Sequence, residues 1–234
     1  MLAGTLPVTQ PFDFSKSLAF LGIFTPTQSE QFLGDQTLIK AFRINSQTIG
    51  CKLWSENDEL HYELTSNSPI SPDTHEQTRD HLRFFLSLDD DLTQFYALAD
   101  DDPRFQPILH KLYGYHQVKF ASPFENACWA ILSQRTPMSQ ARKIKQRPID
   151  RYGDHITIDG QTYPAFPTTH DLITVDEETL ATLIGNERKA SYLFSAIQAF
   201  NTVDNTFLRH GNYEEVEAFL RSIKGIGEWS ASFI

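Results

Sequence analysis

The sequence predicts an α+β fold in which a small antiparallel β-sheet domain is followed by an all-helical domain. Three β-rich runs lie near the start of the chain, at residues 38–44, 48–54 and 60–65. From about residue 73 onward, apolar residues recur at the spacing of helix faces instead. The segment between the two patterns is rich in proline and serine, as linkers are. We therefore expect an α+β domain over residues 1–72 and a helical domain over residues 73–234.

Turn-forming residues separate the β-rich runs. Asn45-Ser46 lies between the first and second runs, and Glu56-Asn57-Asp58 lies between the second and third. Asparagine and aspartate tolerate the backbone conformations of tight hairpin turns. The runs should therefore form an antiparallel meander, which a helix over residues 15–24 should cover.

The clearest helix start is Ser122-Pro123-Phe124-Glu125. Serine at the N-cap with glutamate three residues later is the capping-box pattern, and proline suits the first helical turn. Thr136-Pro137 restarts the chain as a second helix, so Gln134-Arg135-Thr136 should form a corner between the two helices. Pro148 lies within the second helix and should break or kink it at about Arg147.

Composition indicates a globular protein. No apolar run approaches the roughly 20 residues of a membrane-spanning helix, and no signal peptide opens the chain, so we expect no membrane partner. Cys51 and Cys128 have neither disulfide-framework nor metal-ligand spacing. We expect a cytoplasmic location, associated with the nucleoid if the source is bacterial.

The net charge of −10 argues at first against a nucleic-acid partner, but the charge is unevenly distributed. Residues 89–102 carry six aspartates and no basic residue, whereas residues 109–153 carry eight lysines or arginines against Glu125 and Asp150. A local basic face on an acidic protein can bind a phosphate backbone. The alternative is an ordinary solvated helix face.

The most informative segment is residues 220–231, which reads Leu-Arg-Ser-Ile-Lys-Gly-Ile-Gly-Glu-Trp-Ser-Ala. Another capping-box pattern, at residues 212–215, begins the helix before it. Gly225 and Gly227 allow a sharp turn and the close approach of another backbone. The segment therefore predicts two helices joined by a hairpin, with main-chain amides directed outward where a phosphate could accept from them.

This segment resembles the helix-hairpin-helix of the DNA glycosylase superfamily, and Trp229 with Ser230-Ala231 is similar to its DNA-3-methyladenine (alkylbase) type. Further motifs follow the order of that family over roughly residues 105–234. They are Pro123-Phe124-Glu125, Ala130-Ile131-Leu132-Ser133-Gln134, Tyr152-Gly153, Phe166-Pro167, Lys189-Ala190 and Gly225-Ile226-Gly227.

The resemblance implies base excision repair. Such an enzyme extrudes a damaged base from duplex DNA and hydrolyses its N-glycosidic bond, and we expect a monomer that acts on alkylated purines. The base pocket would include Trp229 and Phe233. By the same resemblance, Trp229 lies where the lyase branch of the superfamily places its Schiff-base lysine. An indole cannot form that imine, so the enzyme would be monofunctional. The expected DNA-binding residues are Lys224, Gly225, Gly227, Ser230, Gln134 and Arg135.

The same resemblance bears on ions and on the catalytic group. The hairpin would hold a structural sodium or potassium ion on the main-chain carbonyls of Arg221, Ile223 and Ile226, and no other cofactor is implied. Two cysteines cannot supply an iron–sulfur cluster. The family's catalytic aspartate would lie beyond Ile234, so we expect a C-terminally truncated helical domain with impaired catalysis. The alternatives are a non-catalytic DNA-binding protein and an inactive glycosylase remnant.

Overall fold

The computed structural model describes residues 2–234, except for the side chains of residues 99–101. The chain divides into two compact units. The sheet unit comprises the chain up to Lys119 together with Ile156–Tyr163, and the helical unit comprises Phe120–His155 and Pro164–Ile234. This division differs from the boundary at residue 72 that the sequence suggests. None of the described helices is long and apolar enough to cross a membrane.

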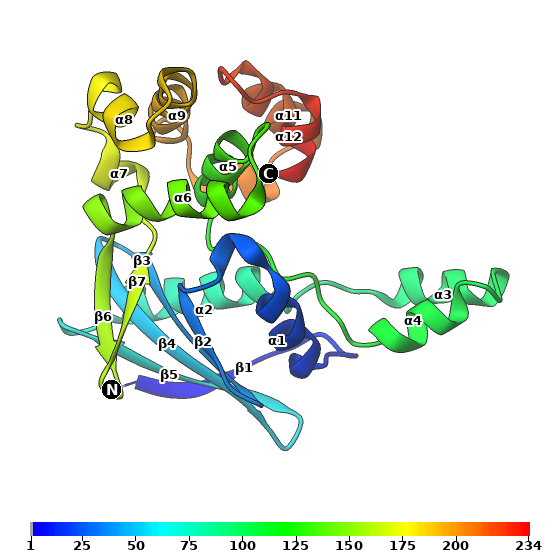
Figure 1. Cartoon of the computed structure of the whole chain (residues 1–234). Coiled ribbons are helices and arrows are strands. Elements are labelled where there is room, and N and C mark those ends of the chain that lie inside the picture. The colour runs from blue at the N-terminus through cyan, green and yellow to red at the C-terminus, as the bar shows by residue number, and fades with distance from the viewer. Residues whose placement is uncertain (1) are drawn as a thin grey trace. The chain divides into compact units, whose positions relative to one another are not determined.

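The sheet unit contains a five-stranded antiparallel sheet, which confirms the predicted fold class (Figure 1). The three β-rich runs are its central strands, and two short strands that the sequence analysis missed form its edges. In spatial order the strands are β1 (Leu2–Leu6), β5 (Glu59–Ser66), β4 (Gln47–Glu56), β3 (Thr37–Ile44) and β2 (Gln31–Leu33). The edge strands are five and three residues long, too short to show a clear alternation.

Both predicted turns are two-residue hairpins. Ile44 pairs with Gln47, and Glu56 pairs with Glu59. The two residues inside each turn have positive φ angles, which are 47° and 62° in the first turn and 52° and 63° in the second. Left-handed values at both positions identify the type I′ geometry that matches strand twist. The strand register therefore follows directly from local sequence.

Within residues 2–119, four α-helices accompany the sheet. They are α1 (Phe14–Ile23), α2 (Pro72–Leu86), α3 (Thr93–Asp101) and α4 (Gln106–Leu112), with a short 3₁₀ turn, η1 (Thr25–Thr27), after α1. Helix α1 confirms the helix predicted over residues 15–24. Phe42 of β3 meets Phe85 of α2 edge to face at 5.4 Å, so α2 also covers the sheet.

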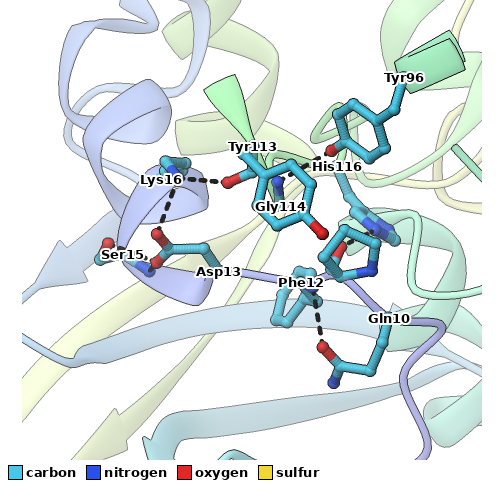
Figure 2. Close-up of polar contacts among 10 residues, drawn as sticks. Gln10, Phe12, Asp13, Ser15, Lys16, Tyr96, Tyr113, Gly114 and His116 are labelled. Atoms are coloured by element: carbon cyan, nitrogen blue, oxygen red, sulfur yellow. Dashed lines mark hydrogen bonds and ion pairs between the residues drawn. The ribbon is translucent and has the colours of Figure 1, made fainter. Parts of the chain in front are cut away.

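Hydrogen bonds near α1 explain why residues beyond 72 belong to the sheet unit (Figure 2). The Asp13 N–H donates to Gly114 O at 2.7 Å, and Lys16 donates to the carbonyl of Tyr113. The Gly114 N–H in turn donates to the hydroxyl of Tyr96 at 2.8 Å. Burial raises the pKa of Asp13, but hydrogen bonds from Ser15 and Lys16 outweigh that effect and lower it overall. These contacts bind the segment after α4 to the start of α1.

The helical unit is built around α5 (Pro123–Leu132), in which every residue is buried. Its core combines apolar residues of α5 with those of the surrounding helices. The other helices are α6 (Met138–Tyr152), α7 (Thr169–Leu172), α8 (Glu177–Ile184), α9 (Glu187–Phe200), α10 (Asn205–His210), α11 (Tyr213–Ser222) and α12 (Glu228–Phe233).

The expectation of helices throughout residues 73–234 was wrong at one place. Strands β6 (Asp154–Ile158) and β7 (Gln161–Ala165) form a two-stranded hairpin. Its turn is Asp159-Gly160, with φ angles of 51° and 79°. An Asp-Gly pair flanked by alternating apolar residues is a strong hairpin signal, which the sequence analysis overlooked.

Pro148 does not break α6, which continues through it to Tyr152. Proline removes one amide donor from the helix, which costs most in the middle of a long helix. Pro148 lies near the end of α6, where the Gly153 N–H closes the helix on the carbonyls of Pro148 and Ile149 at 3.2 and 2.9 Å. One missing donor is therefore tolerated there.

The capping box predicted at Ser122 forms only in part. The Glu125 N–H donates to Ser122 Oγ at 3.1 Å, as expected. The Glu125 carboxylate instead turns inward and pairs with Lys145 Nζ of α6 at 2.6 Å. Both side chains are 1% exposed, and the Lys145 ammonium lies 4.9 Å from the centre of the Phe166 ring. A buried ion pair thus links α5 to α6.

Breaking this pair should destabilise the protein strongly. Lys145→Met leaves a buried carboxylate without its cation, which typically costs about 3–5 kcal/mol. Lys145→Met combined with Glu125→Gln removes both charges and should recover much of that loss. Urea denaturation followed by circular dichroism measures the difference. Equal destabilisation by the single and double variants would show that packing at Lys145, and not its charge, is what matters.

Candidate functional site

The hairpin between α11 and α12 forms as predicted. The side chain of Asn212 caps α11 by accepting from the N–H groups of Glu214 and Glu215 at 2.9 and 3.3 Å. Gly225 lies in the turn with a φ of 93°, a left-handed value that favours glycine. A Cβ atom at Gly225 would also lie 2.4 Å from Cγ of Tyr192 in α9. The fold therefore requires glycine at position 225 on two grounds.

Gly227 differs from Gly225 in both respects. Its φ of −97° is a value that any residue can adopt, and a Cβ atom at this position would have no neighbour within 4 Å. Neither conformation nor packing within the described structure requires glycine at this position. Because glycine has no side chain, the main chain at Gly227 is uncovered, and the backbone of a bound molecule can approach it closely.

Three hydrogen bonds fix the hairpin to other parts of the helical unit. Gln134 Nε2 donates to Gly225 O at 2.8 Å. The Lys224 N–H donates to Ser195 Oγ at 3.3 Å, and Lys224 Nζ donates to Ser191 Oγ at 2.8 Å. The structure thus brings together two predicted site segments, the corner at Gln134 and the hairpin, that are far apart in sequence.

Arg135 projects from the corner between α5 and α6. Its side chain is exposed, and its φ of 50° is unusual for a residue other than glycine. Lys189 of α9 holds the corner from the inside, because its Nζ donates to Leu132 O at 2.6 Å and also to Thr136 Oγ1. Burial lowers the pKa of Lys189. The corner therefore places an arginine on the surface at a fixed point.

Trp229 and Phe233 form an exposed aromatic pair on α12. The side chains are 73% and 40% exposed, and their rings stack at 5.4 Å with an interplanar angle of 10°. Asn126 Nδ2 of α5 donates to Phe233 O at 2.7 Å and so holds the end of α12. Ser230, between the two aromatic residues, is buried and offers little surface to a ligand.

The main-chain carbonyls expected to hold a monovalent cation lie in the hairpin region. The carbonyl of Ile223 accepts from the Ile226 N–H at 3.0 Å, which leaves one lone pair for a ligand. Neutral carbonyl oxygens suit a hard cation. The main-chain carbonyls of Arg221, Ile223 and Ile226 therefore have the right chemistry for sodium or potassium. The cation site stays a prediction. Among the described residues, no group of three or more histidines, cysteines or carboxylates could hold a metal.

The sequence analysis missed Tyr192 and Arg188, which lie beside the hairpin on α9. Arg188 Nε donates to the Tyr192 hydroxyl at 2.8 Å, and its guanidinium lies 5.5 Å from the centre of that ring. Tyr192 also supports Gly225. No local pattern could have revealed this role, because it depends on a contact between distant segments.

Comparison with known proteins agrees with this geometry. Residues 128–225 match the family model described as HhH-GPD superfamily base excision DNA repair protein. The chain is similar to this superfamily over that segment. A DNA-3-methyladenine glycosylase from Bacillus subtilis (strain 168) is 27% identical over 173 residues, which are 73% of this chain and 57% of the relative. The chain therefore spans little more than half the length of that relative.

Solved structures confirm the fold. A 3-methyladenine DNA-glycosylase from Archaeoglobus fulgidus aligns with a TM-score of 0.78 at 20% identity, covering 100% of this chain and 78% of that chain. An 8-oxoguanine glycosylase/lyase from Clostridium acetobutylicum, in its apo form, aligns with a TM-score of 0.67 at 14% identity, covering 99% and 78%. These likenesses show that the chain has the fold of the helix-hairpin-helix glycosylases.

The two hairpin glycines should respond differently to substitution. Gly225→Ala should destabilise the protein, because a left-handed alanine costs about 1–2 kcal/mol and its Cβ would strike Tyr192. Gly227→Ala should not destabilise the protein, because its Cβ would enter open space. It should gain a few tenths of a kcal/mol to about 1 kcal/mol from the lower entropy of the unfolded chain. Urea denaturation of both variants tests this contrast. A large loss of stability in Gly227→Ala would show that this glycine serves the fold.

Proposed function

We propose that this protein is a base excision repair glycosylase that hydrolyses the N-glycosidic bond of flipped alkylated purines in duplex DNA. The observation that carries the proposal is Gly227, a glycine that the fold does not require, in an exposed hairpin beside Lys224. The named relative from Bacillus subtilis supports the choice of alkylated purines.

The hairpin suits the sugar–phosphate backbone. The open main chain at Gly227 permits a phosphate to approach its amide, and Lys224 adds a positive charge beside it. Lys224 is held by Ser191 and lies 6.0 Å from the centre of the Tyr192 ring, so its ammonium has a restricted position. Backbone contacts position a protein on DNA without reading its bases. The hairpin should therefore bind damaged and undamaged duplexes alike.

The aromatic pair suits a base that has left the helix. Alkylated purines such as 3-methyladenine carry positive charge, and an aromatic face attracts a cation. Trp229 stacks on Phe233 and is 73% exposed, so its outer face can receive such a base. Because so little of Trp229 is buried, removing its side chain should change the free energy of unfolding little. The indole of Trp229 has no amine that could form a Schiff base with the sugar, which supports hydrolysis without a lyase step.

Hydrolysis would pass through an oxocarbenium-like sugar, whose charge a carboxylate stabilises. No acidic residue follows Glu228 in the printed sequence. The roles proposed for residues 1–234 are therefore to bind the duplex and to receive the flipped base.

Binding measurements on three variants test the proposal. Lys224→Ala should weaken binding to damaged and undamaged duplexes equally and should reduce the salt-dependence slope by about 0.9, the value for one phosphate contact. Gly227→Ala should weaken both duplexes without loss of stability. Trp229→Ala should mainly weaken binding to a duplex that carries an alkylated purine. Fluorescence anisotropy over a salt series measures all three effects.

Chromatography of the bases released from methylated duplex DNA provides the test of chemistry. The protein should release alkylated purines slowly, and Trp229→Ala should slow that release further. Duplex binding without any base release would favour the non-catalytic DNA-binding alternative. If the folded Lys224 and Gly227 variants bind undamaged DNA as tightly as the parent, the hairpin is only a structural turn.

A further inference from the structure

His116 is a buried histidine of the sheet unit, and both of its ring nitrogens lie against main-chain carbonyls. Its side chain belongs to a residue that is only 1% exposed. The Nδ1 atom lies 2.6 Å from Ser87 O, and the Nε2 atom lies 3.0 Å from Pro11 O. The ring also meets that of Phe12 edge to face at 5.2 Å (Figure 2). His116 therefore bridges two segments that are far apart in the sequence.

The two carbonyl partners determine which protonation state satisfies this ring. A carbonyl oxygen only accepts, so each ring nitrogen must donate to its partner. A neutral imidazole carries one N–H, and its other nitrogen would direct a lone pair at an oxygen. That contact is repulsive, and a buried polar atom without a partner costs free energy. The doubly protonated imidazolium donates to both carbonyls.

The end of helix α2 favours a positive charge at the same place. Ser87, whose carbonyl lies against Nδ1, is the C-cap of α2. The last carbonyls of a helix carry partial negative charge, which stabilises a cation beside them. The helix end and the two hydrogen bonds therefore favour the same protonation state.

The charged groups that flank this helix end pair with one another. Arg83 Nη2 donates to Asp89 Oδ1 at 2.6 Å. Lys119, three residues after His116, has its Nζ atom 3.7 Å from Asp90 Oδ1. Each cation on these two segments thus has a carboxylate of its own.

The segment before α1 is balanced in the same way. Asp13 Oδ2 lies 3.0 Å from Lys16 Nζ. Burial raises the pKa of the neighbouring Tyr115 to about 12, so its hydroxyl stays uncharged. In the part of the chain that the structure describes, the His116 ring hydrogen-bonds to carbonyl oxygens and not to a carboxylate. Its proton is therefore held by main-chain dipoles.

His116 takes part in a network around the end of α2. The Thr9 N–H donates to Leu88 O at 2.8 Å, which joins the same two segments as His116 does. Ser87 Oγ donates to Gln117 O at 2.5 Å. The network has one more hydrogen bond when both ring nitrogens donate than when the ring is neutral.

We propose that His116 is a pH-sensitive latch, which as an imidazolium holds the segment before α1 against the end of α2. Loss of the proton breaks one of its two hydrogen bonds and turns a lone pair toward a carbonyl oxygen. A histidine in an unfolded chain loses its proton at about pH 6.5. The latch therefore stabilises the fold fully below that pH, and its contribution is lost as the pH rises and the folded ring gives up its proton.

Nuclear magnetic resonance of the parent protein tests the protonation state directly. Long-range ¹H–¹⁵N spectra show similar shifts for the two nitrogens of an imidazolium and well-separated shifts for a neutral ring. The internal control is His75, whose Nε2 atom lies 2.8 Å from the Tyr62 hydroxyl, a group that can donate or accept. His116 should keep its proton to a higher pH than His75 does. Loss of the proton at the same pH or a lower one would overturn the proposal.

Urea denaturation over a pH series tests the effect on the fold. Between about pH 6 and pH 8.5, the urea midpoint of the parent should fall further than that of His116→Gln, which has no proton to lose. His116→Arg keeps a charge and several donors, so it should also lack this extra loss. The matched control, His75→Gln, should retain the pH dependence of the parent.

An equal pH dependence in the parent and in the two His116 variants would show that the ring contributes packing alone, and would overturn the latch. If neither His116 variant folds, the resonance measurement on the parent decides. Because the latch lies in the sheet unit, neither test depends on DNA binding by the hairpin.

Discussion

The helical unit depends on the complete burial of α5. A helix with no exposed face must satisfy its polar side chains and its last carbonyls inside the protein. Each of these bonds joins α5, or the corner that follows it, to a different element. The bonds are Glu125 to Lys145 of α6, Asn126 to Phe233 O of α12, Leu132 O to Lys189 of α9, and Gln134 to Gly225 O of the hairpin. Core packing and the position of the candidate DNA surface therefore have the same origin.

The two hairpin glycines show how structural and functional requirements can be separated. Gly225 is explained by its left-handed backbone and by contact with Tyr192. Gly227 has neither reason, and its surroundings within the described chain are open. An exposed glycine without a packing role reduces stability, because it increases the conformational entropy of the unfolded chain. Its presence in the hairpin is understandable if another molecule approaches the main chain there.

Local features of the sequence predicted much of this structure. The turns at Asn45 and Asn57, the Ser122 cap and the glycine hairpin depend on neighbouring residues, so they could be identified from pattern alone. The inward turn of Glu125 could not be predicted, because it requires Lys145 from another helix. The contact between Tyr192 and Gly225 likewise joins two segments far apart in the sequence, so no local pattern could reveal it. The Asp159-Gly160 hairpin was predictable and was missed.

The central claim is that the hairpin and the corner that Gln134 joins to it form one DNA-binding surface. Hydrogen–deuterium exchange of the protein, with and without an undamaged duplex, tests this claim most directly. Slower exchange is expected at residues 134–136 and 224–230 when DNA is bound, with the strands β1–β5 unchanged. Protection confined to the sheet unit, or the absence of protection under saturating DNA, would contradict it.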